Sequence, residues 1–467
     1  MSDESVGDYG AYVESKLSRV PNTGIVGALD LPDSLFPHQR SMTAWALRRG
    51  RAAIFADTGM GKMRMELVFA DVVQKHTRMP FMIHTPLAVA AQLAAEAAKI
   101  GITAKVCREA SDLIDGINIA NYERLHKFDT SIFGGVVLDE SGCIKHHDTK
   151  TFSALTAAYR DTPFKLPATA TPAPNDWTEL GTHAEFLGIC TRQEMLAEYF
   201  THDGGDTSVW RLKGHARDVF WRWVASWGAM IRKPSDLGFD DGLYNLPPLH
   251  LHQHTVDFEM PLNGMLFAAE AQSLSERREA RRESLKDRVA ACAAMVNAQP
   301  NEPWVVWCDL NAEGDALTAS IDGAIQIAGA DSVEVKERRL VEFAQGQHRV
   351  LVSKPSICGH GLNWQHASHM AFVGVTDSYE AFYQAVRREW RFGQTKPVHV
   401  HVFASRAEGA VVANLKRKER EAGEMAASLS AETRDAVMAE VIGLQRQTNT
   451  YNASRSVAVP AWLKDAA

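Results

Sequence analysis

The stretch Ala52-Ala53-Ile54-Phe55-Ala56-Asp57-Thr58-Gly59-Met60-Gly61-Lys62 joins a short apolar run to a glycine-rich turn that ends in a lysine. The segment after it, Met65-Glu66-Leu67-Val68-Phe69, is compatible with a helix. A strand, a glycine-rich loop and a helix start form a phosphate cradle, in which backbone N–H groups face the phosphates and Lys62 reaches the β- and γ-phosphates. The stretch therefore predicts a nucleotide-binding α/β lobe, and the alternative is an ordinary strand-to-helix turn.

Position 63 departs from what such a cradle needs. Met63 stands where a Ser or Thr would give a hydroxyl to Mg²⁺. A thioether is a soft ligand and does not replace a hard oxygen for magnesium. We expect the loop to bind nucleotide, with a water in the missing ligand position. The loop residues expected to line the nucleotide are Asp57, Thr58, Gly59, Met60, Gly61, Lys62 and Met63.

Short apolar runs alternate with helical segments along most of the chain. A first series comprises Ala52–Phe55, Phe81–His84, Ile117–Ile119 and Gly135–Leu138. A second series comprises Pro303–Trp307, Val350–Val352, Ala371–Val373 and Val398–Val402. Such alternation is typical of βαβ units and parallel sheets. The sequence therefore predicts an α/β fold with two lobes, each a mostly parallel sheet flanked by helices.

These patterns divide the chain into five parts. They are a flexible leader (1–30), a first lobe (31–189), a helical Trp-rich insert (190–255), a second lobe (256–405) and a helical tail (406–467). In the insert, Phe220, Trp223 and Trp227 recur at helical spacing, which favours core packing over base stacking. The charged segment Glu276–Glu283 fits a solvated helix face with i,i+4 pairs, and the edge of a nucleic-acid track is the alternative.

Three alternating histidines, His250, His252 and His254, share one face if they lie on a strand. Metal binding and an exposed strand face both fit this pattern. We favour the strand face.

Composition limits the class of protein. The chain has 467 residues, 45% apolar and 23% charged, which is ordinary for a soluble globular protein with more than one core. A net charge of −7 leaves room for a local basic track that grips nucleic acid. The 6 cysteines form no C-x-x-C pair, and no apolar run has the length of a membrane span. We therefore expect a cytoplasmic protein with no membrane partner.

An acidic pair ends the run Val136-Val137-Leu138, about 75 residues after the glycine-rich loop. Asp139 is suited to hold Mg²⁺. Glu140 is suited to orient and deprotonate a water that attacks the phosphate. The order of the two motifs strengthens the prediction of a nucleotide hydrolase.

Six further segments add to these two motifs. They are Leu35–Arg40, the pairs Thr85-Pro86 and Asn121-Tyr122, Ala168–Asn175, Ser356–Asn363 and Gln384–Gln394. With them the chain, from about residue 31 to 404, resembles the superfamily 2 helicases. Within these it is similar to the Swi/Snf-like translocases and DEAD/DEAH-box-like helicases found in phages and prophages. The clearest likeness is the Q-x-x-x-R-x-x-R-x-G-Q pattern of Gln384–Gln394.

The resemblance implies two RecA-like lobes that share one ATP site, with ATP and Mg²⁺ as cofactors. Gln39 would read adenine, because an amide can pair with its N6 and N7 edge, and Gly361 would also line the nucleotide. Arg388 and Arg391 would act as arginine fingers beside Lys62, Asp139 and Glu140. The implied nucleic-acid contacts are Thr85, Pro86, Asn121, Tyr122, Thr169, Thr171 and Asn363.

The function implied is that of an ATP-dependent DNA helicase or translocase, with DNA as partner and phage replication or recombination proteins as further partners. An RNA helicase is one alternative. Another is a nucleotide-gated binding module that has lost efficient turnover through Met63. Ser141-Gly142 also departs from the family pattern and leaves the link between the acidic pair and Ala168–Asn175 open.

Overall fold

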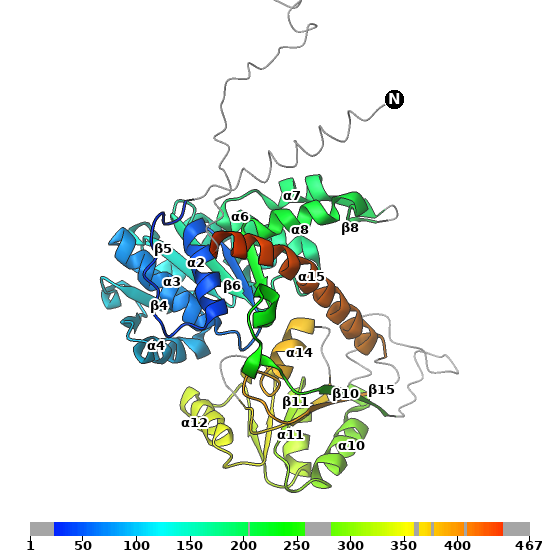
Figure 1. Cartoon of the computed structure of the whole chain (residues 1–467). Helices are drawn as coiled ribbons and strands as arrows, with labels where there is room; N and C mark the ends of the chain where they lie inside the picture. The colour runs from blue at the N-terminus through cyan, green and yellow to red at the C-terminus, as the bar shows by residue number, and fades with distance from the viewer. Residues whose placement is uncertain are drawn as a thin grey trace, which may run out of the picture.

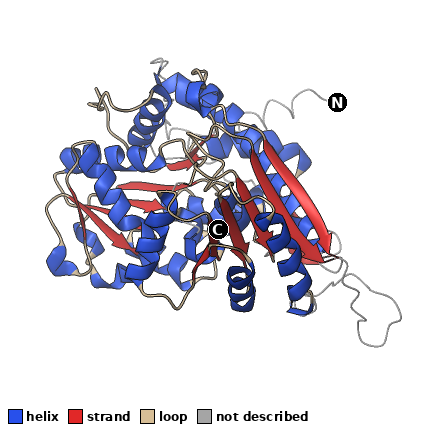
Figure 2. Cartoon of the chain, turned by 90° about the horizontal axis from the view of Figure 1, so that it is seen from below, coloured by secondary structure: helices blue, strands red, loops and turns tan. Residues whose placement is uncertain are grey.

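Two parallel sheets, each covered by helices on both faces, organise the chain (Figure 1). The structure is a computed structural model and describes residues 23–203, 206–256, 282–358, 364–374, 378–405 and 409–441. Figure 2 shows the two groups of strands, each with helices packed around it. Each sheet with its helices forms a RecA-like lobe, so the predicted fold class is confirmed.

The first lobe contains seven parallel strands in the order β3-β4-β2-β5-β6-β1-β9. The strands are β1 (Ala53–Ala56), β2 (Phe81–Thr85), β3 (Ala104–Val106), β4 (Ile117–Asn121), β5 (Gly135–Asp139), β6 (Phe164–Thr169) and β9 (Gly228–Ile231). Its helices are α2 (Pro37–Arg49), α3 (Lys62–Thr77), α4 (Ala90–Lys99), α5 (Lys150–Ala158), α6 (Leu180–Leu187), α7 (Arg192–Tyr199) and α8 (Arg217–Ala225). β1, β2, β5 and β6 are buried along their whole length, because helices cover both faces of the sheet.

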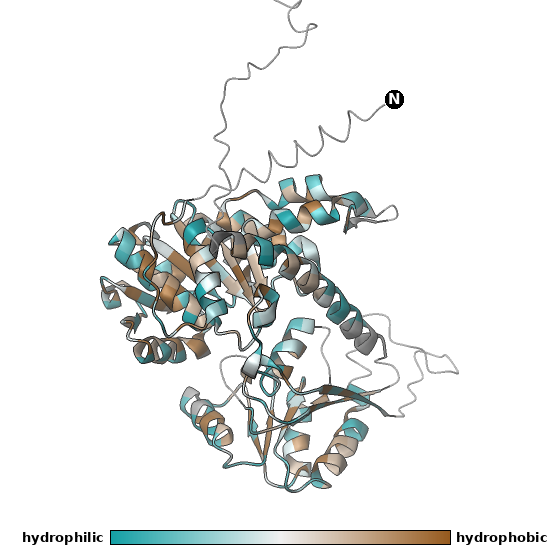
Figure 3. Cartoon of the chain, viewed as in Figure 1, coloured by the Kyte–Doolittle hydropathy of each residue, from teal (hydrophilic) through white to brown (hydrophobic). Residues whose placement is uncertain are grey.

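Apolar side chains form a separate core on each face of this sheet. One core joins the strands to α2, α3 and α4. The other joins them to α5, α6, α7 and α8, and it contains the buried side chains of Phe220, Trp223 and Trp227. The prediction of core packing for these aromatics is confirmed. Figure 3 shows the hydrophobic colours concentrated on the strands of both lobes.

The second lobe contains six parallel strands in the order β10-β15-β14-β11-β13-β12. The strands are β10 (Leu249–Val256), β11 (Trp304–Cys308), β12 (Ala324–Ile327), β13 (Val350–Ser353), β14 (His369–Val373) and β15 (Val398–Ser405). The helices are α10 (Leu285–Asn297), α11 (Asn311–Ser320), α12 (Val333–Ala344), α13 (Pro355–Cys358) and α14 (Tyr379–Val386). α10 and α11 pack on one face, whereas α12, α13 and α14 pack on the other.

Residues 190–255, predicted as a helical insert, form a hairpin flanked by two helices and add one strand to each of the two sheets. Two helices, α7 and α8, flank an antiparallel hairpin of β7 (Phe200–Asp203) and β8 (Asp206–Leu212). β9 pairs with β1 in the first sheet, and β10 pairs with β15 in the second. The lobe boundary therefore lies between β9 and β10. β10 alternates His with other residues, so it does not form the continuous apolar run that marks a buried strand.

The long helix α15 (Gly409–Val441) runs from the second lobe back across the first (Figure 1). Its buried side chains Met425 and Leu429 join the core beside α8. The Thr433 hydroxyl accepts a hydrogen bond from the backbone N–H of Met230 in β9, with an N···O distance of 2.9 Å. The helix thus covers the free edge of the first sheet. In the described part of the tail, the prediction of a helix is confirmed.

Within the described ranges no helix is long and apolar enough to cross a lipid bilayer. Part of the predicted leader (1–22) and the charged segment up to residue 281 lie outside these ranges.

Candidate nucleotide site between the two lobes

The glycine-rich loop connects the buried end of β1 to the first residue of α3, Lys62. Gly59 and Gly61 both have positive φ, 95° and 83°, a backbone region that favours glycine. Gly61 is the N-cap of α3, and this helix start carries no side-chain cap among the described residues. The predicted strand, loop and helix start are therefore present, and the N-terminus of α3 is open to an anion.

Two side chains of α2 contact the backbone of this loop. The Gln39 amide donates to the Met60 carbonyl at 3.1 Å, and the His38 ring nitrogen lies 3.3 Å from the same oxygen. The Gln39 amide oxygen accepts from the Phe36 N–H at 3.1 Å. An added Cβ at Gly61 would lie 2.0 Å from Gln39 Nε2. Gln39 thus positions the loop, and one amide hydrogen remains for the predicted adenine contact.

Lys62 meets both carboxylates of the acidic pair at the end of β5. Its Nζ donates to Glu140 Oε1 at 2.6 Å and lies 4.0 Å from Asp139 Oδ1. Glu140 has a φ of 52°, which is rare for a residue with a side chain. Burial acts to lower the pKa of Lys62, but the surrounding carboxylates outweigh it and raise this pKa above its ordinary value. The ammonium therefore stays charged in this site.

Asp139 is held by the last residue of β2 and by the turn that follows β4. Thr85 Oγ1 donates to Asp139 Oδ2 at 2.8 Å, and the Tyr122 hydroxyl donates to the Asp139 carbonyl at 2.6 Å. Burial raises the pKa of Asp139 above its ordinary value, and Lys62 opposes this shift. The side chain is therefore fixed at the end of β5, beside Lys62.

A third carboxyl, which the sequence did not single out, lies behind this pair. Glu66 on α3 is fully buried and interacts directly with Asp139 and electrostatically with Lys62. Burial raises the pKa of Glu66 well above its ordinary value, and the Asp139 carboxylate acts in the same direction. Its position four residues after Lys62 places it on the same helix face, and this spacing is the one signal that could have revealed it.

Ser141 lies beside a histidine of α6, and Gly142 faces a side chain of the second lobe. Ser141 Oγ lies 3.0 Å from Nε2 of His183 on α6, and both residues are fully buried. Burial lowers the pKa of His183 to about 4, so the imidazole is neutral. At Gly142 an added Cβ would lie 2.5 Å from Oε1 of Glu380 in the second lobe. Ser141 and His183 therefore link the acidic pair to α6, and Gly142 leaves room for Glu380.

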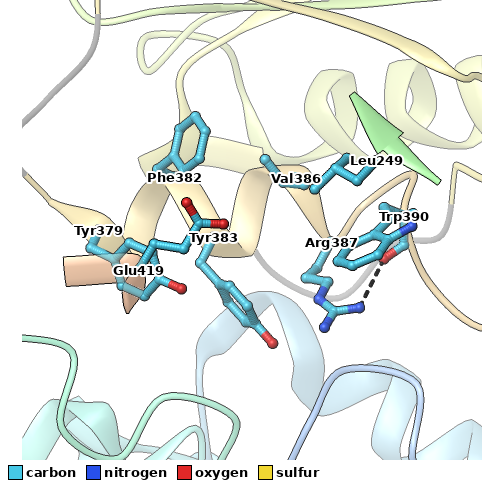
Figure 4. A pocket seen from close by; sticks show the side chains of 8 residues that line it. All are labelled: Leu249, Tyr379, Phe382, Tyr383, Val386, Arg387, Trp390 and Glu419. Atoms are coloured by element: carbon cyan, nitrogen blue, oxygen red, sulfur yellow. Dashed lines mark hydrogen bonds between the residues drawn. The ribbon is translucent and has the colours of Figure 1, made fainter. Parts of the chain in front are cut away.

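Side chains of α14 and the turn after it reach from the second lobe to the phosphate loop. Arg387 Nη2 and the Tyr383 hydroxyl both donate to the Asp57 carboxylate, and Lys145 pairs with Glu380. Figure 4 shows Tyr383 and Arg387 pointing toward the first lobe, with Arg387 bonded to the Trp390 carbonyl. Arg387 was not predicted as a site residue, because the likeness to known helicases drew attention to its neighbour Arg388.

The two predicted arginines lie beside this contact. Burial lowers the pKa of Arg388 to about 9, with Arg391 acting in the same direction and Glu140 opposing it. Burial, then the charge of Arg387, lowers the pKa of Arg391 to about 10. The structure therefore brings Arg388 into electrostatic range of Glu140 across the two lobes.

The residues predicted to contact nucleic acid differ in how deeply they are buried. Thr85 and Thr169 are fully buried, and Thr169 Oγ1 accepts from the Thr171 N–H at 3.2 Å. Thr85 and Tyr122 support Asp139. In this structure the Thr85 and Thr169 hydroxyls therefore make contacts inside the first lobe. Pro86 and Asn121 are half-buried at the same edge, and Thr171 is buried. Gly361 and Asn363 lie outside the described residues.

Neither a protein-family model nor a curated protein matches the sequence. Among solved structures, the chain is similar to one described as the Sulfolobus solfataricus SWI2/SNF2 ATPase core in complex with dsDNA. The two share 14% identity with a TM-score of 0.43, and the match covers 90% of this chain and 98% of that chain. A likeness at this level does not identify a substrate or a reaction, so the function is inferred from the site geometry and the sequence motifs.

Proposed function

We propose that the chain is an ATPase that binds ATP with Mg²⁺ between its lobes, hydrolyses it and uses the cycle to move along DNA. The observation that carries this proposal is the junction at the phosphate loop. There Glu140 of the first lobe, which pairs with Lys62, lies within electrostatic reach of Arg388, while Arg387 contacts Asp57. An interlobe site of this composition suits phosphoryl transfer, which is catalysed mainly by positioned charges that stabilise the transition state.

The first lobe supplies the phosphate cradle and the general base. Incoming phosphates would draw the Lys62 ammonium away from Glu140, because the open N-terminus of α3 and Lys62 both favour anions. Glu140, once released, can orient a water and accept its proton. Asp139, fixed by Thr85, would hold Mg²⁺, which when bound neutralises charge on the phosphate oxygens.

The second lobe supplies positive charge to the transferred phosphoryl group. The guanidinium groups of Arg388 and Arg391 match phosphate oxygens in shape and remain protonated at neutral pH. Closure of the lobes on ATP completes the site, and release of products lets it reopen. Alternation between these states would shift the nucleic-acid contacts of one lobe relative to the other.

The choice of DNA rests on the Swi/Snf-like pattern of Gln384–Gln394, and so does the suggestion of phage replication or recombination partners. Half-buried Pro86 and Asn121, at the ends of β2 and β4, are the candidate backbone contacts that retain some exposure. RNA remains the alternative ligand for the same surface, because such motors contact the phosphate backbone.

One experiment tests the proposal. ATP hydrolysis is measured without nucleic acid and with single-stranded DNA, duplex DNA and RNA, for the wild type, Lys62→Ala and Lys75→Ala. Lys75 is the matched control, since it lies on the same helix and makes an exposed i,i+4 pair with Asp71. We expect DNA-stimulated hydrolysis that only Lys62→Ala abolishes. Wild-type rates equal to Lys62→Ala under every condition would contradict the proposal and leave a nucleotide-gated module. Stimulation by RNA alone would replace DNA as the ligand.

A further inference from the structure

Met63 leaves the proposed metal without the hard oxygen that a Ser or Thr would supply next to Lys62. Its half-buried side chain packs against the apolar core between α2 and α3. A water ligand in the cleft was the expectation from the sequence. The structure contains another source of oxygen on the same helix.

Glu66 lies one turn further along α3, and its side chain is fully buried. Its neighbours in the sequence, Met65 and Leu67, belong to the apolar core. Neither carboxyl oxygen of Glu66 receives a hydrogen bond from an N–H or O–H donor among the described residues. A carboxyl in such a place costs several kcal/mol unless it is neutralised or paired, and an apolar side chain would avoid that cost.

The partner of Glu66 is another acid. Its carboxyl contacts that of Asp139, and Lys62 and Glu140 are also within electrostatic range. Two carboxyl groups in contact are joined either by a proton or by a cation. Among the described residues there is no group of three or more acidic, His or Cys side chains placed to hold a metal ion by themselves. Mg²⁺ on a nucleotide needs fewer, because one or two carboxylates complete a shell made mostly of phosphate and water oxygens.

We propose that Glu66 and Asp139 together hold the divalent cation of the bound Mg²⁺–nucleotide, with Glu66 replacing the hydroxyl ligand that is missing at Met63. This inference rests on the proposed function. A carboxylate is a hard oxygen donor like the missing hydroxyl, and it adds a negative charge. Glu66 then contributes to nucleotide binding only when Mg²⁺ is present. The phosphate cradle binds the nucleotide with or without Mg²⁺.

The test measures the affinity for a fluorescent ADP analogue with excess Mg²⁺ and with EDTA. We expect the wild type to bind about tenfold more tightly with Mg²⁺, a difference of about 1.4 kcal/mol. Glu66→Gln should lower this ratio to near one and leave the affinity in EDTA unchanged. Restoring the hydroxyl in the double variant Glu66→Gln/Met63→Thr should recover most of the ratio. Electron paramagnetic resonance of Mn²⁺ with ADP should show the same loss and recovery of bound metal.

Two controls keep the outcomes separate. Glu389→Gln removes another fully buried carboxyl without a hydrogen-bond partner among the described residues, and its ratio should equal that of the wild type. Met63→Thr alone should change the ratio of the ADP affinities in Mg²⁺ and in EDTA less than twofold, because Glu66 already fills the ligand position. This variant provides the test if Glu66→Gln fails to fold. A Mg²⁺ ratio retained by Glu66→Gln, or a large gain in Met63→Thr alone, would overturn the inference and leave a proton between Glu66 and Asp139. Absence of ADP binding by the wild type in both buffers would instead contradict the proposed function.

Discussion

Arg387 of the second lobe donates a hydrogen bond to the carboxylate of Asp57 in the phosphate loop of the first. The guanidinium stacks 4.4 Å from the ring centre of Trp390, and Tyr383 donates to the same carboxylate. The loop that receives the phosphates is therefore in direct contact with the lobe that must close on them. The Asp57–Arg387 ion pair therefore joins the nucleotide-binding loop to the lobe that closes on it.

Loss of this ion pair should separate the lobes. We expect Arg387→Ala to weaken the interlobe contact by about 3 kcal/mol, because the largely buried Asp57 carboxylate loses its charged partner and keeps only the Tyr383 hydroxyl from the second lobe. The radius of gyration from small-angle scattering, measured without nucleotide, should increase. Arg417→Ala, on the exposed part of α15, is the control and should leave it unchanged. An unchanged radius of gyration in Arg387→Ala would mean that other contacts hold the lobes together.

Gly61 should be the most sensitive glycine of the loop. In Gly61→Ala the positive φ costs about 1–2 kcal/mol, and the new methyl group displaces the Gln39 amide from Met60. We expect ADP affinity, measured in EDTA by fluorescence, to fall about tenfold. Gly101→Ala has a similar φ, +74°, with no heavy atom within 4 Å of the added Cβ, so it separates backbone strain from the effect on the loop. Equal affinities in the two variants would contradict the role of Gln39.

Ser141 should couple the acidic pair to the helix that carries His183. Removal of the hydroxyl in Ser141→Ala leaves the buried His183 ring nitrogen without this partner, which costs about 1–3 kcal/mol. We expect basal ATP hydrolysis to persist and its stimulation by DNA to fall several-fold. Ser131→Ala, an exposed serine of the same lobe, provides the comparison. Full stimulation in Ser141→Ala would show that this hydrogen bond is only structural.

Stability of the second lobe should depend on pH through stacked histidines along β10, β14 and β15. The rings in this stack are His250, His252, His254, His369, His399 and His401. Burial, reinforced by the neighbouring histidines, lowers the pKa of His401 to about 3. An unfolded histidine titrates near 6.5, so below that pH the unfolded chain binds more protons and stability falls as the pH is lowered.

Urea unfolding at pH about 7.5 and about 5 measures this effect, with an expected loss of about 1–2 kcal/mol at the lower pH. His401→Phe keeps an aromatic ring but cannot be protonated, so its loss should be smaller. A wild-type loss that His401→Phe leaves unchanged would assign the pH dependence to other groups.

The fold followed from the sequence because its central strands are continuous apolar runs, and such runs form buried parallel strands wherever helices cover both faces. β10 was not recognised as part of the second sheet, since its pairing partner β15 lies almost 150 residues later and its own pattern is alternating. Local patterns carry no information about a partner at that distance.

The proximity of Lys62, Asp139 and Glu140 could be predicted, because the glycine-rich loop and the acidic pair each follow a buried parallel strand, and such strand ends meet at one edge of the sheet. The rest of the candidate site could not be predicted, because tertiary geometry selects among similar side chains. Arg387 and Arg388 are adjacent, and only the turn after α14 decides which of them reaches Asp57. Glu66 resembles any polar residue of an amphipathic helix until the burial of α3 is known. The pairing of Ser141 with His183 joins segments that no motif connects.

The chain passes from the first lobe to the second between β9 and β10, and α15 leads it back. Ala422 of α15 packs against the core of the second lobe, whereas Leu429 and Thr433 anchor its later turns on the first lobe. One continuous helix therefore bridges the two lobes. Any motion that breaks the Asp57–Arg387 contact must bend this helix or detach it from one lobe.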